Sequence, residues 1–179
     1  MFPVLDAVLE RARRQGAVDV EVFGERSTSR RIKVFRQEVE QLTAARRRGV
    51  GLRVFRDGAV GHAYTSDLSE DALDDLVRRA LDNVAVSDAD EYMALPRPQG
   101  EPADVRPYDS RLAAATDAQR IAVALEVEAA ALAADRRVKL VEATLYAAAD
   151  GAVFIVRTAG VRRSHRAGPS SACAYVLAA

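Results

Sequence analysis

The sequence has little of what would support a disulfide framework or charge-driven binding. Its 179 residues include a single cysteine, Cys173, and equal numbers of basic and acidic residues, 26 of each. One cysteine cannot form an internal disulfide, which fits a reducing cytoplasm. A net charge of zero provides no overall field to attract nucleic acid or an anionic membrane. We therefore expect a cytoplasmic protein that binds neither a nucleic acid nor a membrane.

Long apolar segments and targeting signals are also missing. No apolar run reaches the roughly 20 residues that span a bilayer. The N-terminus, Met-Phe-Pro-Val-Leu-Asp, lacks the basic and apolar regions of a secretory signal. A chain of this length can bury a real core, as one domain of ordinary size or as two small ones.

Residue patterns for metal binding and nucleophilic catalysis are absent. The two histidines, His62 and His165, are far apart, and no His-Glu-x-x-His, Cys-x-x-Cys or Gly-x-Ser-x-Gly spacing occurs. We interpret Cys173 as a small buried strand residue, since no partner is placed nearby in sequence to activate its thiol. The sequence predicts no catalytic, cofactor-binding or metal-binding residue.

Residues 49–65 give the clearest structural signal. Two alternating runs flank Asp57-Gly58, a pair typical of the type I′ turn of a hairpin. A two-residue loop places Val54 opposite Gly61, so one face is large on one strand and small on the next. This face predicts a groove for a helix. The helix follows at 69–85, with Ser69 as N-cap and a stripe formed by Leu73, Leu76, Val77, Ala80, Leu81 and Val84.

The rest of the chain predicts helices followed by strands, twice. A helix at 3–15 precedes about five strands within 18–65, with a polar turn at 25–29. A second helix begins at Thr116, which has capping-box spacing to Gln119, and ends near Asp135. Its apolar side is expected to carry Ile121, Leu125 and Leu132. Strands are then expected at 138–148, 152–158, 161–166 and 171–177, with Asp150-Gly151 as a hairpin turn and Gly160 as a further turn.

These elements predict an α+β fold of mainly antiparallel meander sheets flanked by helices. We place an N-terminal α/β domain at 1–87 and a second α/β domain at 109–179. A linker at 88–108 separates them, because that segment is rich in proline. The last predicted strand is apolar and has no polar residues after it, so we expect the chain to be a fragment whose second domain is truncated.

Two groups of polar residues are candidates for binding. Arg53, His62 and Tyr64 share one face of the predicted hairpin, as candidate contacts to a peptide or partner or as polar residues on the less buried face. The basic clusters are Arg46-Arg47-Arg48 and Arg162-Arg163-x-His165-Arg166. They are interpreted as phosphate-binding or as solvated, salt-bridged strand ends, and the zero net charge favours the second interpretation.

Short stretches within residues 18–160 match, in order, one protein family. They are Val20-Glu-Val-Phe, Val39-Glu-Gln-Leu-Thr, Gly49-Val-Gly-Leu-Arg-Val-Phe-Arg-Asp-Gly, Gly61-His-Ala-Tyr-Thr-Ser-Asp-Leu-Ser, Leu76-Val-Arg-Arg-Ala-Leu, Tyr108-Asp-Ser-Arg-Leu and Glu126-x-Glu-Ala-Ala-Ala-Leu-Ala-Ala-Asp. Together they resemble the N-terminal region and the start of the middle region of the TldD/PmbA family, also called the modulator-of-DNA-gyrase family.

The resemblance implies a cytoplasmic bacterial or archaeal protein whose full-length relatives are longer. In that family the TldD subunit is a zinc metalloprotease with a His-Glu-x-x-x-His motif in a C-terminal domain. Its partner PmbA has a similar fold without that motif, and the pair degrades or trims peptides. This chain contains no His-Glu pair, so zinc is expected only in the absent C-terminal domain.

The resemblance leads to one functional expectation and one alternative. We expect the non-catalytic N-terminal scaffold and substrate-chamber portion of a metallopeptidase subunit, acting in peptide proteolysis or maturation and inactive alone. Its partner would be a related TldD/PmbA-type subunit in a homodimer or heterodimer, and its substrate a peptide. Whether the subunit is of the TldD or PmbA type stays open. The alternative is a stand-alone module that binds protein or nucleic acid and has no enzymatic activity.

Overall fold

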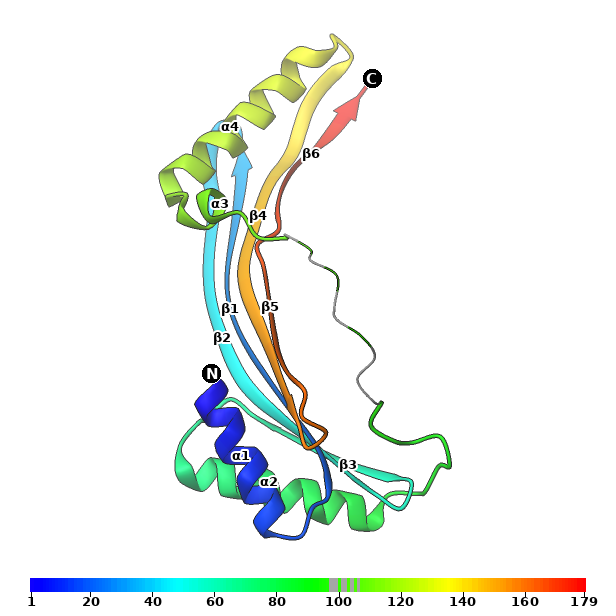
Figure 1. The fold of residues 1–179 in the computed structure, drawn as a ribbon. Coiled ribbons are helices and arrows are strands. Elements are labelled where there is room, and N and C mark those ends of the chain that lie inside the picture. The colour runs from blue at the N-terminus through cyan, green and yellow to red at the C-terminus, as the bar shows by residue number, and fades with distance from the viewer. Residues whose placement is uncertain (97–99, 101–102, 104, 106) are drawn as a thin grey trace. The chain divides into compact units, whose positions relative to one another are not determined.

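The computed structural model describes residues 1–96, 100, 103, 105 and 107–179. The helices are α1 (Phe2–Arg14), α2 (Glu70–Val86), α3 (Ser110–Ala114) and α4 (Asp117–Ala134). The strands are β1 (Asp19–Phe35), β2 (Glu38–Arg56), β3 (Ala59–Thr65), β4 (Val138–Arg157), β5 (Arg162–Ala167) and β6 (Ser170–Ala178) (Figure 1).

The described strands form one antiparallel six-stranded sheet. Its order is β3-β2-β1-β4-β5, and β6 also pairs with β4. Helices precede strands at two places along the chain, first α1 before β1–β3 and then α3 and α4 before β4–β6. The α+β class and the repeated helix-then-strands arrangement predicted from the sequence are confirmed.

The described chain divides into two compact units. The first comprises Met1–Arg26, Arg47–Asp104 and Ala152–His165, and the second comprises Ser27–Arg46, Val105–Gly151 and Arg166–Ala179. Strands β1, β2 and β4 contribute to both, because each is 17 to 20 residues long. Of the predicted linker at 88–108, residues 97–99, 101–102, 104 and 106 lie outside the described residues. The predicted domain boundaries therefore stay a prediction.

The core of the first unit is built on the predicted hairpin and its helix. Strands β2 and β3 pair in the expected register, with Val54 opposite Gly61, and Asp57 and Gly58 have positive φ angles of 51° and 79°. The α2 stripe is buried against this face at Leu73, Leu76, Val77, Ala80 and Val84. Gly61 is required there, because a Cβ would overlap the backbone of α2 at Ala80 and Val84.

Helix α1 completes this core. Leu5, Val8 and Ala12, which helical spacing places on one face, are fully buried. Side chains also join α1 to α2, since the Arg11 Nε donates to Asp74 at 2.8 Å. At the start of α2 the predicted N-cap, Ser69, makes no side-chain capping bond. Instead its backbone N–H donates to the Asp67 carboxylate at 2.9 Å, so the Asp67 side chain orders the entry to the helix.

The prediction of about five strands within 18–65 is wrong. The described chain has three strands there, because residues 25–29 continue β1 and do not turn. The turn lies at Arg36-Gln37, where φ is 53° and 61°. Polar residues at 25–29 remain extended because β1 has hydrogen-bonded neighbours on both sides, β2 and β4. Strand pairing there outweighs local turn preference.

The predicted hairpin turn at Asp150-Gly151 is also wrong. Strand β4 runs through it without a break, and neither residue has a positive φ angle. The Asp150 carboxylate accepts hydrogen bonds from the Arg166 Nε at 3.0 Å and Nη2 at 2.7 Å. The ion pair with Arg166 therefore holds the Asp150 side chain while the backbone of this dipeptide stays extended. The chain turns later, at Gly160, as predicted.

Helix α4 carries the predicted capping box of the second unit. The Thr116 hydroxyl accepts from the Gln119 N–H at 3.2 Å, and the Gln119 side-chain oxygen accepts from the Thr116 N–H at 2.8 Å. The predicted apolar side is shifted by a residue, because the buried positions are Arg120, Ala124 and Glu128, with Ile121 and Leu125 beside them and Leu132 exposed.

Two further predictions concern individual features. The expectation that Cys173 is buried is wrong, because Cys173 lies exposed on β6, a strand at the border of the described sheet. Among the described residues, no helix combines the length and the apolar composition needed to cross a membrane.

Candidate peptide-contact face

Strands β2 and β3 bring Arg53, His62 and Tyr64 together. Arg53 lies directly opposite His62, and Tyr64 lies opposite Gly51, so the three side chains share the sheet face turned away from the core of α1 and α2. The period of two along a strand produces this arrangement, since the alternate residues Leu52, Val54 and Ala63 face the core. Tyr64 is 51% exposed.

Tyr64 occupies space that the glycines of β2 leave free. A Cβ on Gly49 would overlap the phenol of Tyr64, whereas one on Gly51 would meet the ring only at ordinary contact distance, 3.9 Å. The ring therefore lies across the neighbouring strand at a place where that strand has no side chain. This contact explains why the sequence has glycine at position 49.

A buried carboxylate lies beside these residues. Glu21 is only 3% exposed, and its Oε1 accepts from the Arg53 Nε at 2.8 Å while its Oε2 accepts from the Arg157 Nε at 2.5 Å. Two guanidinium groups around one carboxylate leave a net positive charge. Arg157 is mostly buried, whereas about half of the Arg53 side chain is exposed. The excess charge is therefore accessible at Arg53.

Sequence reasoning missed Glu21 and Arg157. The alternation along β1 places Glu21 on the face opposite Val20 and Val22. To infer from this that Glu21 shares a face with Arg53, one would also need to know the register of β1 and β2. Arg157 is 136 positions from Glu21. No local pattern connects residues so far apart, and only the pairing of the strands does so.

These side chains surround an open groove of about 300 Å³. It lies within the first unit and is lined by Glu21, Phe23, Gly51, Leu52, Arg53, His62, Ala63 and Tyr64. Exposed aromatic rings beside a cationic group suit an extended segment that carries apolar and acidic side chains. No nucleophile activated by a base is present among these residues. The groove is therefore suited to binding, and its own residues provide no hydrolytic chemistry.

The outer edge of β3 is already occupied. The Asn83 side-chain amide of α2 donates to the His62 carbonyl at 2.8 Å, and the Arg79 Nη2 donates to the Tyr64 carbonyl at 3.1 Å. A peptide that extended the sheet at this edge would need these same carbonyl groups. These two carbonyl groups of β3 are therefore already hydrogen-bonded within the chain.

The described residues do not fit a zinc site. Among them, no group of three His, Cys, Asp or Glu side chains lies close enough to hold a metal ion.

In the second basic cluster, Arg162 pairs with Asp6 at 2.5 Å and Arg166 pairs with Asp150, so both are salt-bridged as the second interpretation of that cluster predicts.

Solved structures share this fold. A candidate modulator of DNA gyrase from Bacteroides thetaiotaomicron matches 99% of the chain with a TM-score of 0.87 and 19% identity. A candidate modulator of DNA gyrase from Thermotoga maritima matches 99% with a TM-score of 0.85 and 18% identity, and TldE from Thermococcus kodakarensis matches 98% with 0.84 and 13%. The chain spans 41%, 40% and 39% of these structures' lengths, respectively.

Family comparisons identify both halves of the chain. At the level of single sequences, no curated protein matches it. The PmbA/TldA metallopeptidase domain 1 matches residues 20–84, and the PmbA/TldA metallopeptidase central domain matches residues 110–178. The two domains occur in this order and leave unmatched only short segments at the ends and the region around the predicted linker. The chain therefore belongs to the TldD/PmbA family.

Proposed function

We propose that this chain is the non-catalytic N-terminal portion of a TldD/PmbA-type metallopeptidase subunit, where it forms scaffold and part of a substrate chamber. The observation that carries the proposal is the open groove beside Arg53, His62 and Tyr64, on a sheet face that α1 and α2 leave uncovered. Its aromatic and cationic lining suits a peptide, and among the described residues no group of three His, Cys, Asp or Glu side chains lies close enough to hold a metal ion.

The remaining parts of the activity are assigned to other segments and chains. Zinc and the hydrolytic groups would belong to a C-terminal domain, and a related subunit would complete a homodimer or heterodimer. In this scheme Tyr64 and Phe23 contact apolar side chains of the peptide, while Arg53 contacts a carboxylate of the peptide and keeps its bond to Glu21.

Peptide titration of the 179-residue chain tests the groove. Unstructured peptides with an aromatic residue next to Asp or Glu should bind more tightly than the same peptides with Lys in place of the acid. Tyr64→Ala should weaken this binding about fivefold or more, as loss of an aromatic anchor does. Tyr92→Ala is the matched control, because Tyr92 is exposed in the same unit outside the groove. Equal binding by both variants would contradict the assignment of the groove.

Metal and activity measurements test the non-catalytic role. The purified chain should contain substoichiometric zinc by elemental analysis and show no metal-dependent cleavage of unstructured peptides, since a hydrolytic site needs about three protein ligands. Stoichiometric zinc that is lost in His62→Ala or His165→Ala would contradict this role. Saturable binding of nucleic acid at physiological salt would instead favour the stand-alone binding module.

A further inference from the structure

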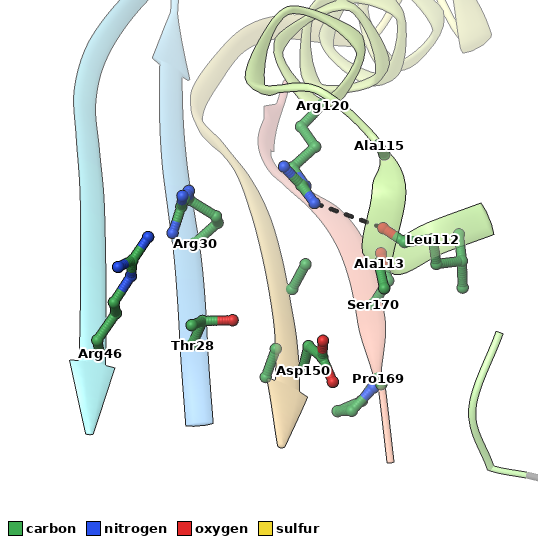
Figure 2. Close-up of a pocket in the computed structure, with 13 residues that line it drawn as sticks. Thr28, Arg30, Arg46, Leu112, Ala113, Ala115, Arg120, Asp150, Pro169 and Ser170 are labelled. Atoms are coloured by element: carbon green, nitrogen blue, oxygen red, sulfur yellow. Dashed lines mark hydrogen bonds between the residues drawn. The ribbon is translucent and has the colours of Figure 1, made fainter. Parts of the chain in front are cut away.

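A second pocket lies entirely within the second compact unit. It has a volume of about 240 Å³ and is formed by residues of β1, β2, β4, the start of β6 and the segment from α3 to α4 (Figure 2). A water molecule takes about 30 Å³ of liquid, so the pocket has room for a small polyatomic ion together with several waters. Nothing in the proposed peptide-contact groove involves these residues.

Three arginines from three different elements line the pocket: Arg30 of β1, Arg46 of β2 and Arg120 of α4. One carboxylate oxygen, the Asp117 Oδ1, accepts from both the Arg30 Nε at 3.2 Å and the Arg120 Nη1 at 3.0 Å. The guanidinium group of Arg46 has no ion pair and no hydrogen bond to another described residue. Asp150, which also lines the pocket, is paired with Arg166. The guanidinium charge around the pocket therefore exceeds the carboxylate charge by about two.

Arg120 is the most deeply placed of the three. It is 9% exposed, and Figure 2 shows its side chain reaching from α4 into the pocket, where its Nη2 donates to the Leu112 carbonyl at a long 3.4 Å. Its Nε has no hydrogen-bond partner in the part of the chain that the structure describes. A buried charged group normally has its donors satisfied and its charge balanced. Arg120 shares the Asp117 carboxylate with Arg30, so its charge is only partly balanced and its Nε donor is not satisfied.

We propose that this pocket binds a doubly charged oxyanion, either a phosphate group or a dicarboxylate. Guanidinium groups form paired hydrogen bonds with both kinds of oxyanion, and three of them converge here from separate elements. A dianion would balance the excess charge that Asp117 leaves. The hydroxyl of Thr28 lines the same pocket and adds a neutral hydrogen-bonding group.

The site accounts for one residue of the basic run Arg46-Arg47-Arg48. Arg46 lines the pocket, whereas Arg47 and Arg48 do not. All three are exposed, so the run looks uniform in sequence and in exposure. Only the position of Arg46 next to Arg30 and Arg120 distinguishes it, and this position makes Arg47 a matched control for a charge-neutralising substitution.

NMR titration at low, constant ionic strength tests the proposal. Inorganic phosphate, succinate and, as a monovalent control, chloride are added to the 179-residue chain while the Arg120 Nε–Hε signal and the amide signals around the pocket are followed. Phosphate or succinate should give saturable shifts, and chloride should not. Arg46→Ala should weaken the binding about tenfold, as loss of one charge-assisted contact does, while Arg47→Ala should change it by less than twofold.

The possible outcomes distinguish a phosphate site from a carboxylate site, and they also show whether the proposal fails. Saturation by phosphate alone identifies a phosphate site, and saturation by succinate alone identifies a carboxylate site. Absence of saturable shifts with both, or equal weakening by Arg46→Ala and Arg47→Ala, overturns the proposal. Because Arg46 is exposed, a native amide spectrum of Arg46→Ala is expected, and Arg46→Glu provides a second variant that should abolish binding.

Discussion

The carboxylate of Glu128 on α4 accepts a 2.6 Å hydrogen bond from the backbone N–H of Gln37, in the turn between β1 and β2. It also accepts from the N–H of Arg36 at 2.9 Å and from the Gln37 side-chain amide at 2.8 Å. Glu128 is 1% exposed. Both turn residues have positive φ angles, although neither is glycine, asparagine or aspartate. The helix therefore holds in place a turn whose own sequence does not favour it.

Removing this carboxylate should destabilise the protein strongly. Glu128→Ala leaves two backbone N–H groups of the turn without an acceptor, and we expect a loss on the order of 3 kcal/mol in the free energy of unfolding. Glu128→Gln keeps one acceptor oxygen and should cost less, about 1 kcal/mol. Urea denaturation measures both. Glu126→Ala, at an exposed position of the same helix, is the control and should stay within about 0.5 kcal/mol of the parent.

The packing of β3 on α2 predicts that position 61 tolerates no side chain. Gly61→Leu should overpack the contact with Ala80 and Val84 and cost about 1–3 kcal/mol. Gly51→Ala is the matched control, because its Cβ would meet neighbouring atoms at 3.8 Å or more. Unchanged denaturant stability in Gly61→Leu would show that the helix does not pack on this face as closely as described.

Local signals explain which elements the sequence predicts correctly. The Asp57-Gly58 turn, the α2 stripe and the Thr116–Gln119 capping box each lie within one continuous segment, and each is present. The Arg36-Gln37 turn has no such signal, because its acceptor is Glu128, 91 positions from Gln37. Polarity predicts a turn at residues 25–29, and the Asp-Gly pair predicts a hairpin turn at Asp150-Gly151. Both segments are extended, because strand neighbours from distant segments pair with them.

The same distinction applies to the two pockets. Arg53, His62 and Tyr64 could be grouped from the sequence because one hairpin carries all three, and the register of that hairpin is set by its turn. Glu21 and Arg157 join them only through strand pairing across 136 positions. Arg30, Arg46 and Arg120 come from three separate elements, so nothing in the sequence indicates that they converge.

At the N-terminus of α3, we expect the pKa of the Asp109 carboxyl group to be measurably lowered. Hydrogen bonds from the Arg111 side chain, and then from its backbone N–H, lower the pKa of Asp109 to about 2. The pKa of Asp109 is lower in the folded state than in the unfolded state. The interaction therefore stabilises the folded state fully at pH values above the ordinary pKa of 3.8. The contribution is lost as the pH falls from about 4 towards 2.

Carbon-detected NMR titration checks this value directly. Arg111→Ala should raise the Asp109 midpoint towards the ordinary value of 3.8 and leave Asp135, which is paired with Arg137, unchanged. High salt should raise the Asp109 midpoint in part, since the pair is exposed to solvent. A midpoint near 3.8 in the unsubstituted chain would show that the Asp109–Arg111 contact does not persist in solution.

Strand β6 predicts self-association. Among the described strands it pairs only with β4, and Tyr175, Val176 and Leu177 are each about half exposed. An apolar strand with an unpaired edge recruits other strands, and a charge on that edge discourages such pairing. Sedimentation velocity should therefore show association that increases with concentration, and Val176→Lys should reduce it. Val105→Lys, exposed outside any strand, should not. A monodisperse parent chain with amides 170–179 strongly protected from exchange would rule this out, because an unpaired edge would then have to be covered within the chain itself.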